Sequence, residues 1–265
     1  MKIFRKVTGF LLILFLYLIL GCSSQKNISS SLWCSENVII DGDFTDWKGK
    51  TTFYDNSTRI SYGIINDSSI LYIGVLIPDQ TLQAKILRTG MHIAVDTTGK
   101  KQMSPCIIYP YAGENALANI DINNRTDFNG IKRRFKLNVQ SMHLSGFKTN
   151  NGVNPVQAAN GVAVGLNWNE NGDMFIEACI PLNSLGRKDL NPADVANVYS
   201  LNISIPAVEP PDFVRNGGGR PSGISGGGGR PGGGGPPSWV TNGNSGMTML
   251  LEEQIIRQKF YLKIK

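Results

Sequence analysis

Most of this chain alternates between apolar and polar residues, which is the pattern of a β-strand that buries one face. In residues 162–168 every second side chain is a large apolar one, and turn-forming residues follow directly at 169–172. Residues 70–77 (ILYIGVLI) are apolar throughout, as in a strand that is buried on both faces. The other alternating runs are residues 60–64, 91–95, 135–139, 174–180, 199–205 and 260–264. Strand-like runs separated by turn residues predict an all-β fold, an antiparallel β-sandwich of the jelly-roll or immunoglobulin-like kind.

Helix signals are few and short. Residues 82–88 favour one or two helical turns, and an Asn-Pro pair at 191–192 favours the start of a helix that reaches about Val198. Residues 247–256 are a third helical candidate.

One segment, residues 216–237, departs from the alternating pattern because it is dominated by glycine. It cannot bury enough apolar surface to offset the entropy lost on ordering, so the sequence predicts a disordered loop. A strand-like run follows it, and we interpret it as a flexible insertion within a single domain, residues 37–265. Its two arginines lack interleaved aromatic residues, so RNA binding is not predicted.

The N-terminus carries a separate signal. Three basic residues precede an apolar run at 7–21, and a small residue lies directly before Cys22, which is the order found in a secretory signal. The run is shorter than the ~20 apolar residues that a membrane-spanning helix needs. Residues 18–22 (LILGC) resemble the bacterial lipoprotein box, whose cysteine thiol is lipidated and becomes the new N-terminus. This resemblance implies a signal peptide at 1–21, a lipid on Cys22 and an exported protein held on a membrane by acyl chains.

Residues 22–36 are polar and rich in serine, and we expect them to form the lipidated cysteine and a tether. Surface lipoproteins of Bacteroidetes-type bacteria usually carry acidic residues just after the lipidated cysteine. The first acidic residue here is Glu36, so we expect attachment to the outer membrane facing the periplasm.

Charge and cysteine content narrow the remaining functions. The net charge of +6 falls to about +3 once the three basic residues of the signal are removed, and a nucleic-acid partner is therefore not expected. Cys34, Cys106 and Cys179 form an odd set in an oxidising compartment. One disulfide plus one free thiol is one arrangement, and sequence spacing does not fix the pairing. No cysteine or histidine spacing indicates zinc.

Four motifs occur in the order found in one family. Residues 38–47 (VIIDGDFTDW) resemble the opening of family 9 carbohydrate-binding modules and their DOMON-like relatives, which begin with Ile-Asp-Gly followed by an Asp and a Trp. Residues 66–75 are similar to the family's Asp-x-x-x-Leu-Tyr-Ile strand, and residues 90–101 to a strand and turn that carry an Asp. Residues 177–186 are similar to its "Glu … Ile-Pro … Leu-Gly" segment. The chain also resembles Bacteroidetes-type lipoproteins that carry this domain.

The resemblance implies a sandwich of about ten strands that binds a glycan and performs no chemistry. The family grips sugars with exposed tryptophans, and Trp168 and Trp239 are the candidates because both lie at loop borders. It also permits a structural calcium, for which Asp41, Asp43 and Asp46 offer carboxylate oxygens. No other cofactor is expected.

The same stretch has a structural interpretation. Asp41-Gly42 is then a turn at the start of a strand, and Trp47 packs over the edge of the sandwich.

Three other functional classes compete with glycan binding. Enzymatic activity is not predicted, because no G-x-S-x-G, H-E-x-x-H or P-loop motif occurs in a strand-to-helix context. Some DOMON-like relatives hold haem b between Met and His, but Met91 and His92 are adjacent and point to opposite sides of a strand. A haem site would need Met91 with His143, or His92 with a distant Met. The remaining alternative is an envelope structural or assembly lipoprotein that binds another protein.

Overall fold

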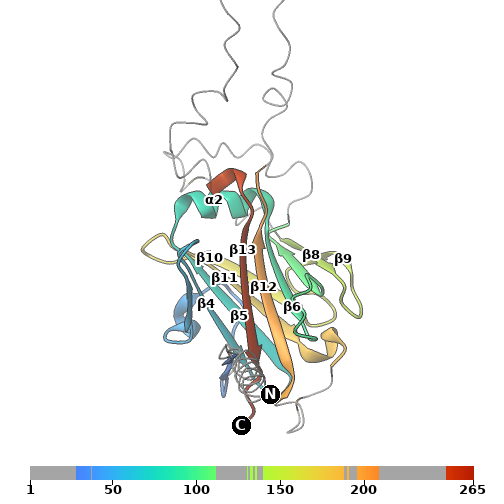
Figure 1. Cartoon of the computed structure of the whole chain (residues 1–265). Coiled ribbons are helices and arrows are strands. Elements are labelled where there is room, and N and C mark those ends of the chain that lie inside the picture. The colour runs from blue at the N-terminus through green and yellow to red at the C-terminus, as the bar shows by residue number, and fades with distance from the viewer. Residues whose placement is uncertain are drawn as a thin grey trace, which may run out of the picture.

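The computed structural model describes residues 28–36, 38–111, 130, 132–133, 135, 140–187, 190, 196–208 and 249–265. These residues form two β-sheets that share one core, and helix α2 lies across one end of the sandwich (Figure 1). The all-β sandwich predicted from the alternating pattern is therefore confirmed. Within the described residues, no helix is both long and apolar enough to cross a membrane.

In the described part of the chain, the first sheet has seven strands and the second has six. The order in the first is β1 (Ser29–Ser30), β13 (Gln254–Tyr261), β12 (Val198–Ile205), β6 (Met91–Asp96), β7 (Cys106–Tyr109), β8 (Ser141–Ser145) and β9 (Gly152–Pro155). The order in the second is β10 (Ala163–Trp168), β11 (Met174–Pro181), β5 (Ile70–Ile77), β4 (Ile60–Asn66) and β2 (Leu32–Trp33), with β3 (Phe53–Asp55) also paired to β4.

The structure differs from the prediction in the direction of two strand pairs and in the residue at which the fold begins. β1 pairs with β13 and β2 with β4 in parallel, so the sheets are mixed rather than purely antiparallel. Both of these strands also fall inside the stretch 22–36 that was expected to be a tether, and the fold therefore begins by Ser29 rather than at residue 37. Two-residue strands carry no readable alternation, which is why the polar sequence hid them.

The alternating pattern places one face of each strand in the core. In β12, for example, Tyr199, Leu201 and Ile203 are at most 1% exposed and belong to the main core cluster. Burying side chains of this size stabilises the fold by roughly 1.5–3 kcal/mol each. β5 is covered on both faces, as its continuous apolar run predicted, because residues 38–47 pack on its outer side.

Two of the three helix predictions can be compared with the structure. Helix α2 (Gln80–Thr89) is confirmed: the Asp79 carboxylate caps it by accepting the Leu82 N–H at 2.9 Å, and Gly90 ends it at a φ of 76°. Among the described residues of 247–256, residues 249–251 are helical, and β13 follows. Residues 191–195 lie outside the described part of the chain, and Val198 already belongs to β12.

The strand predicted at 135–139 is wrong at Phe135, which is helical, and residues 136–139 lie outside the described part. A short alternating run cannot distinguish a strand from a helix that turns one ring inward, and the Phe135 ring is 3% exposed. All three cysteines, Cys34, Cys106 and Cys179, are free in the structure.

The segment that contains the glycine-rich insertion connects two adjacent antiparallel strands, β12 and β13. Its residues 209–248 lie outside the described part of the chain. The described residues on either side of this segment are in contact: the Val208 N–H donates to the Leu250 carbonyl at 2.8 Å. The buried Lys85 ammonium of α2 donates to the carbonyls of Met249 (2.9 Å) and Glu252, which secures the start of β13.

Replacing residues 212–245 with a short glycine-serine linker should therefore leave the sandwich folded. A loop shortened about fivefold costs less entropy to close, and we expect the free energy of unfolding to rise by about 1 kcal/mol. Urea unfolding of both proteins, followed by circular dichroism, measures this change. Loss of cooperative unfolding would instead mean that the replaced residues contribute to the core.

Candidate ligand-binding site

A pocket of about 340 Å³ opens at the edge of the sandwich where β10 ends the six-stranded sheet. The chain crosses here from one sheet to the other. The Val156 N–H donates to the Gln140 carbonyl at 3.1 Å, and the Val156 carbonyl accepts the Val164 N–H at 2.9 Å. The volume lies at the lower end of the range for small-molecule sites, which starts at roughly 300 Å³. The residues that line it are Ile40, Asp41, Tyr109, Phe135, Gln140, Val156, Val164, Leu166 and Asn167.

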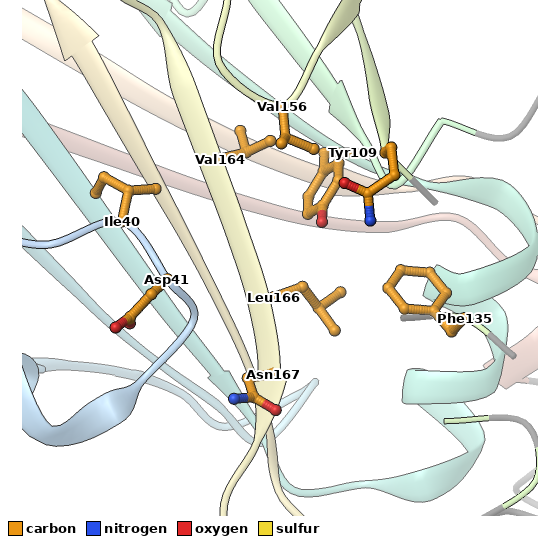
Figure 2. A pocket seen from close by; sticks show the side chains of 9 residues that line it. Ile40, Asp41, Tyr109, Phe135, Val156, Val164, Leu166 and Asn167 are labelled. Carbon is orange, nitrogen blue, oxygen red and sulfur yellow. The ribbon is translucent and has the colours of Figure 1, made fainter. Parts of the chain in front are cut away.

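The apolar wall of the pocket is built from core residues. Tyr109 ends β7 and Leu166 lies in β10, and the two residues are 4% and 9% exposed. The Phe135 ring faces Leu166 across the pocket (Figure 2). All three belong to the main core cluster, so close packing in the core fixes the position of this wall.

Polar side chains border the same pocket. Asp41 and Gln140 are exposed and Asn167 is half-buried, and Asp41 lies across β10 from the Tyr109 and Phe135 rings (Figure 2). Burial raises the pKa of Tyr109 to about 12, so its phenol stays a neutral hydrogen-bonding group near pH 7. An apolar wall bordered by a carboxylate, two amides and a phenol suits a small ligand with both an apolar face and hydroxyl groups.

Trp168, predicted to bind a ligand, lies beside the pocket and is not part of its lining. Its indole N–H donates to Gln83 Oε1 at 3.0 Å, and its ring meets the Phe135 ring edge-on at 5.8 Å. The Lys132 ammonium lies 5.3 Å from the ring centroid. Trp168 therefore packs against Phe135, a residue of the pocket lining, and does not itself face the pocket. Trp239, the other predicted residue, and Cys22 lie outside the described residues.

The three aspartates predicted to bind calcium serve the local backbone. Asp41 Oδ1 accepts the Asp43 N–H at 2.7 Å, and Asp46 Oδ2 accepts the Ile39 N–H at 3.1 Å. Asp43 caps the 3-10 helix η1 (Phe44–Trp47), and its hydrogen bonds from Thr45 lower the pKa of its carboxyl. Within the described residues, no group of three or more His, Cys, Asp or Glu side chains is arranged to hold a metal ion.

Trp47 is fully buried against a flat row of residues on the outer face of the six-stranded sheet. The row crosses four strands and consists of Gly63, Gly74, Glu177 and Gly165, each paired with the next. A Cβ on Gly74 would lie 2.6 Å from the Trp47 ring, so only glycine leaves room for the indole. The packing role inferred for Trp47 is thus confirmed, with the difference that it covers the face of a sheet rather than its edge.

Glu177 is completely buried in this row. Burial raises the pKa of its carboxyl from 4.5 to about 7, although hydrogen bonds from Gly42, Trp47 and Asp41 oppose part of that rise. The folded protein therefore binds this proton more tightly than the unfolded chain does. The resulting stabilisation is fully present below about pH 4.5 and is lost as the pH rises through 7.

We expect this single group to lower the free energy of unfolding by about 2–3 kcal/mol between pH 5 and pH 8. Urea unfolding at both pH values, for the native protein and for Glu177→Gln, isolates the effect because other titrating groups cancel in the difference. Parallel pH profiles of the two proteins would contradict the assignment.

The two histidines lie on the outer face of the seven-stranded sheet, in one row on either side of Ile108. Met91 faces the core and is fully buried. Met91 and His143 therefore lie on opposite sides of the sheet and cannot bind one iron, which removes one of the two haem arrangements.

No protein-family model matches the chain, and no curated protein is significantly similar to it. Among solved structures, the chain is similar to a carbohydrate-binding module family 9 (CBM9) from Caldicellulosiruptor kristjanssonii in complex with glucose. The TM-score is 0.39 at 9% sequence identity, and the match covers 90% of this chain and 96% of that one. A module of the same description in complex with cellotriose gives a TM-score of 0.37 at 10% identity, covering 90% and 94% of the two chains.

Proposed function

We propose that this protein is a non-catalytic binding protein whose pocket at β10 holds a sugar residue of a glycan. The observation that carries the proposal is the lining of the pocket, which combines two aromatic rings with an exposed carboxylate and two amides. A pyranose offers an apolar face to a ring and hydroxyl groups to polar side chains. The four motifs that resemble family 9 carbohydrate-binding modules agree with this proposal.

A glycan array with the purified protein tests the proposal. We expect saturable binding to at least one glycan among plant, host and bacterial sets, with glucose and cellotriose, the ligands of the two CBM9 structures, as soluble probes. Absence of binding to every glycan in these sets would contradict the proposal.

A protein-binding role in the envelope is the second candidate. One row across the outer face of the seven-stranded sheet runs Ile255, Ser204, His92, Ile108, His143 and Val153. Both ends of the row are apolar and exposed, Ile255 at 40% and Val153 at 62%. Partners that co-purify and are lost when both residues become serine would favour this role.

We also propose that Cys22 is lipidated and that the protein is held at the outer membrane, facing the periplasm. Only six residue steps separate Cys22 from Ile28, where the described fold begins, and they reach about 20 Å at most. A lipid there would hold the sandwich close to the membrane surface. Cys22→Ala should release the protein into the soluble fraction, and protease added to intact cells should leave the native protein uncut. Digestion on intact cells would place it on the cell surface instead.

A further inference from the structure

The buried Glu177 carboxylate connects two parts of the chain that are far apart in sequence. Its Oε1 accepts the backbone N–H groups of Asp41, at 2.7 Å, and of Gly42. Its Oε2 accepts the indole N–H of Trp47 at 3.0 Å. Three hydrogen bonds of the described residues thus join the segment 38–47 to the sheet, and all three end on this carboxylate. A buried carboxylate is tolerated only with such partners.

The same three bonds set the border of the pocket. Asp41 lines the pocket together with Ile40, and Gly42 follows them in the turn. A Cβ on Gly42 would lie 2.5 Å from the carbonyl carbon of Leu166 and 2.7 Å from the nitrogen of Asn167. The turn therefore rests directly on the part of β10 that supplies the opposite border.

The register of the sheet explains why Glu177 reaches this turn. Glu177 pairs with Gly165 of β10, and the missing side chain at Gly165 leaves the space that the turn occupies. A Cβ on Gly165 would lie 2.7 Å from the Gly42 nitrogen and 3.1 Å from Glu177 Oε1.

We propose that Glu177 is a positioning residue for the pocket: through the Asp41 and Gly42 amides it holds the Ile40–Asp41 border against β10. The consequence for ligand affinity rests on the proposed function. The positioning itself is a property of the free protein and is measured without ligand.

Amide hydrogen exchange of the full-length protein in detergent tests the proposal. Glu177→Met removes every acceptor and keeps a side chain of similar length, so the Asp41 and Gly42 amides should exchange roughly tenfold faster or more. The Ile40 methyl resonance should shift with them. Trp47→Phe is the matched control, because it removes one donor to Oε2 and leaves both amide bonds to Oε1 in place. It should lower overall stability without selectively exposing these two amides.

Gly165→Ala is a second test that keeps Glu177, in case Glu177→Met does not fold. The new methyl group should displace the turn, with faster exchange of the same amides and the same direction of shift at Ile40. Unchanged Asp41 and Gly42 exchange in the folded variants, or equal exposure in Trp47→Phe, would overturn the proposal.

Titration with cellotriose separates the proposal from the proposed function. A weaker complex with Gly165→Ala but not with Trp47→Phe would extend positioning to affinity. Absence of cellotriose binding by the native protein would count against the choice of ligand and would leave the amide result to decide the role of Glu177.

Discussion

Trp47→Ala should lower the free energy of unfolding by about 4 kcal/mol, the size expected when a large buried aromatic side chain is removed. The indole fills the space above Gly63 and Gly74, and its ring packs edge-on against Phe175 at 5.8 Å. Its loss also deprives the buried Glu177 carboxylate of one donor. Urea unfolding measures the change.

Tyr54→Ala is the control, because Tyr54 is 57% exposed and its removal should change stability by no more than about 0.5 kcal/mol. A Trp47→Ala effect as small as that of Tyr54→Ala would mean that residues 38–47 do not form a second core on the sheet.

The double variant Asp41→Ala/Gln140→Ala should weaken glycan binding by roughly 30-fold or more. Both residues line the pocket and are exposed, so each can be shortened without opening the core. Losing one charged and one neutral hydrogen bond to a ligand costs about 2–4 kcal/mol together, and each 1.4 kcal/mol is a factor of ten. Isothermal titration calorimetry with the strongest glycan of the array gives the ratio of dissociation constants.

Glu170→Ala, which removes an exposed carboxylate outside the pocket, should bind like the native protein. Equal affinities of the double variant and this control would exclude the pocket as the binding site.

The sequence predicts β4, β5, β6, β10, β11 and β12 because each shows either alternation or a continuous apolar run. It places the C-terminal strand at 260–264, whereas β13 spans Gln254–Tyr261, and it does not identify β3, β7, β8 or β9. It fails at β1 and β2, where two-residue strands depend on partners at the far end of the chain and in β4. It also fails at Phe135, where five alternating residues were too few to exclude a helix. These errors arise because tertiary pairing, and not local pattern, determines the local structure.

The pocket is harder to predict than the fold. Its polar border comes from Asp41, Gln140 and Asn167, which belong to three distant segments that meet only because the chain changes sheets at β10. No sequence motif joins them. Trp168 was a reasonable prediction from its place at a loop border, but its indole N–H is taken by Gln83 from α2, a contact that only the folded structure reveals.

The three glycines of the row beneath Trp47 are a sequence signal for this packing that the prediction did not use. Gly63, Gly74 and Gly165 each interrupt a strand, and isolated strand glycines indicate close approach of another part of the chain. Together with the buried Glu177 they mark the place where the Asp-Gly turn and its tryptophan rest. The motifs at 38–47 and 177–186 therefore meet in this outer layer, and the pocket lies at its border.

The most direct measurement of the central claim is a methyl NMR titration of the protein with the strongest glycan of the array. Binding at β10 predicts that the methyl resonances of Ile40, Val156, Val164 and Leu166, which line the pocket, shift together and saturate. Val153 and Ile255, on the outer face of the other sheet, should not shift. Shifts confined to Val153 and Ile255, or no shift of the four pocket resonances at a saturating concentration of the glycan, would contradict the claim that this pocket binds the glycan.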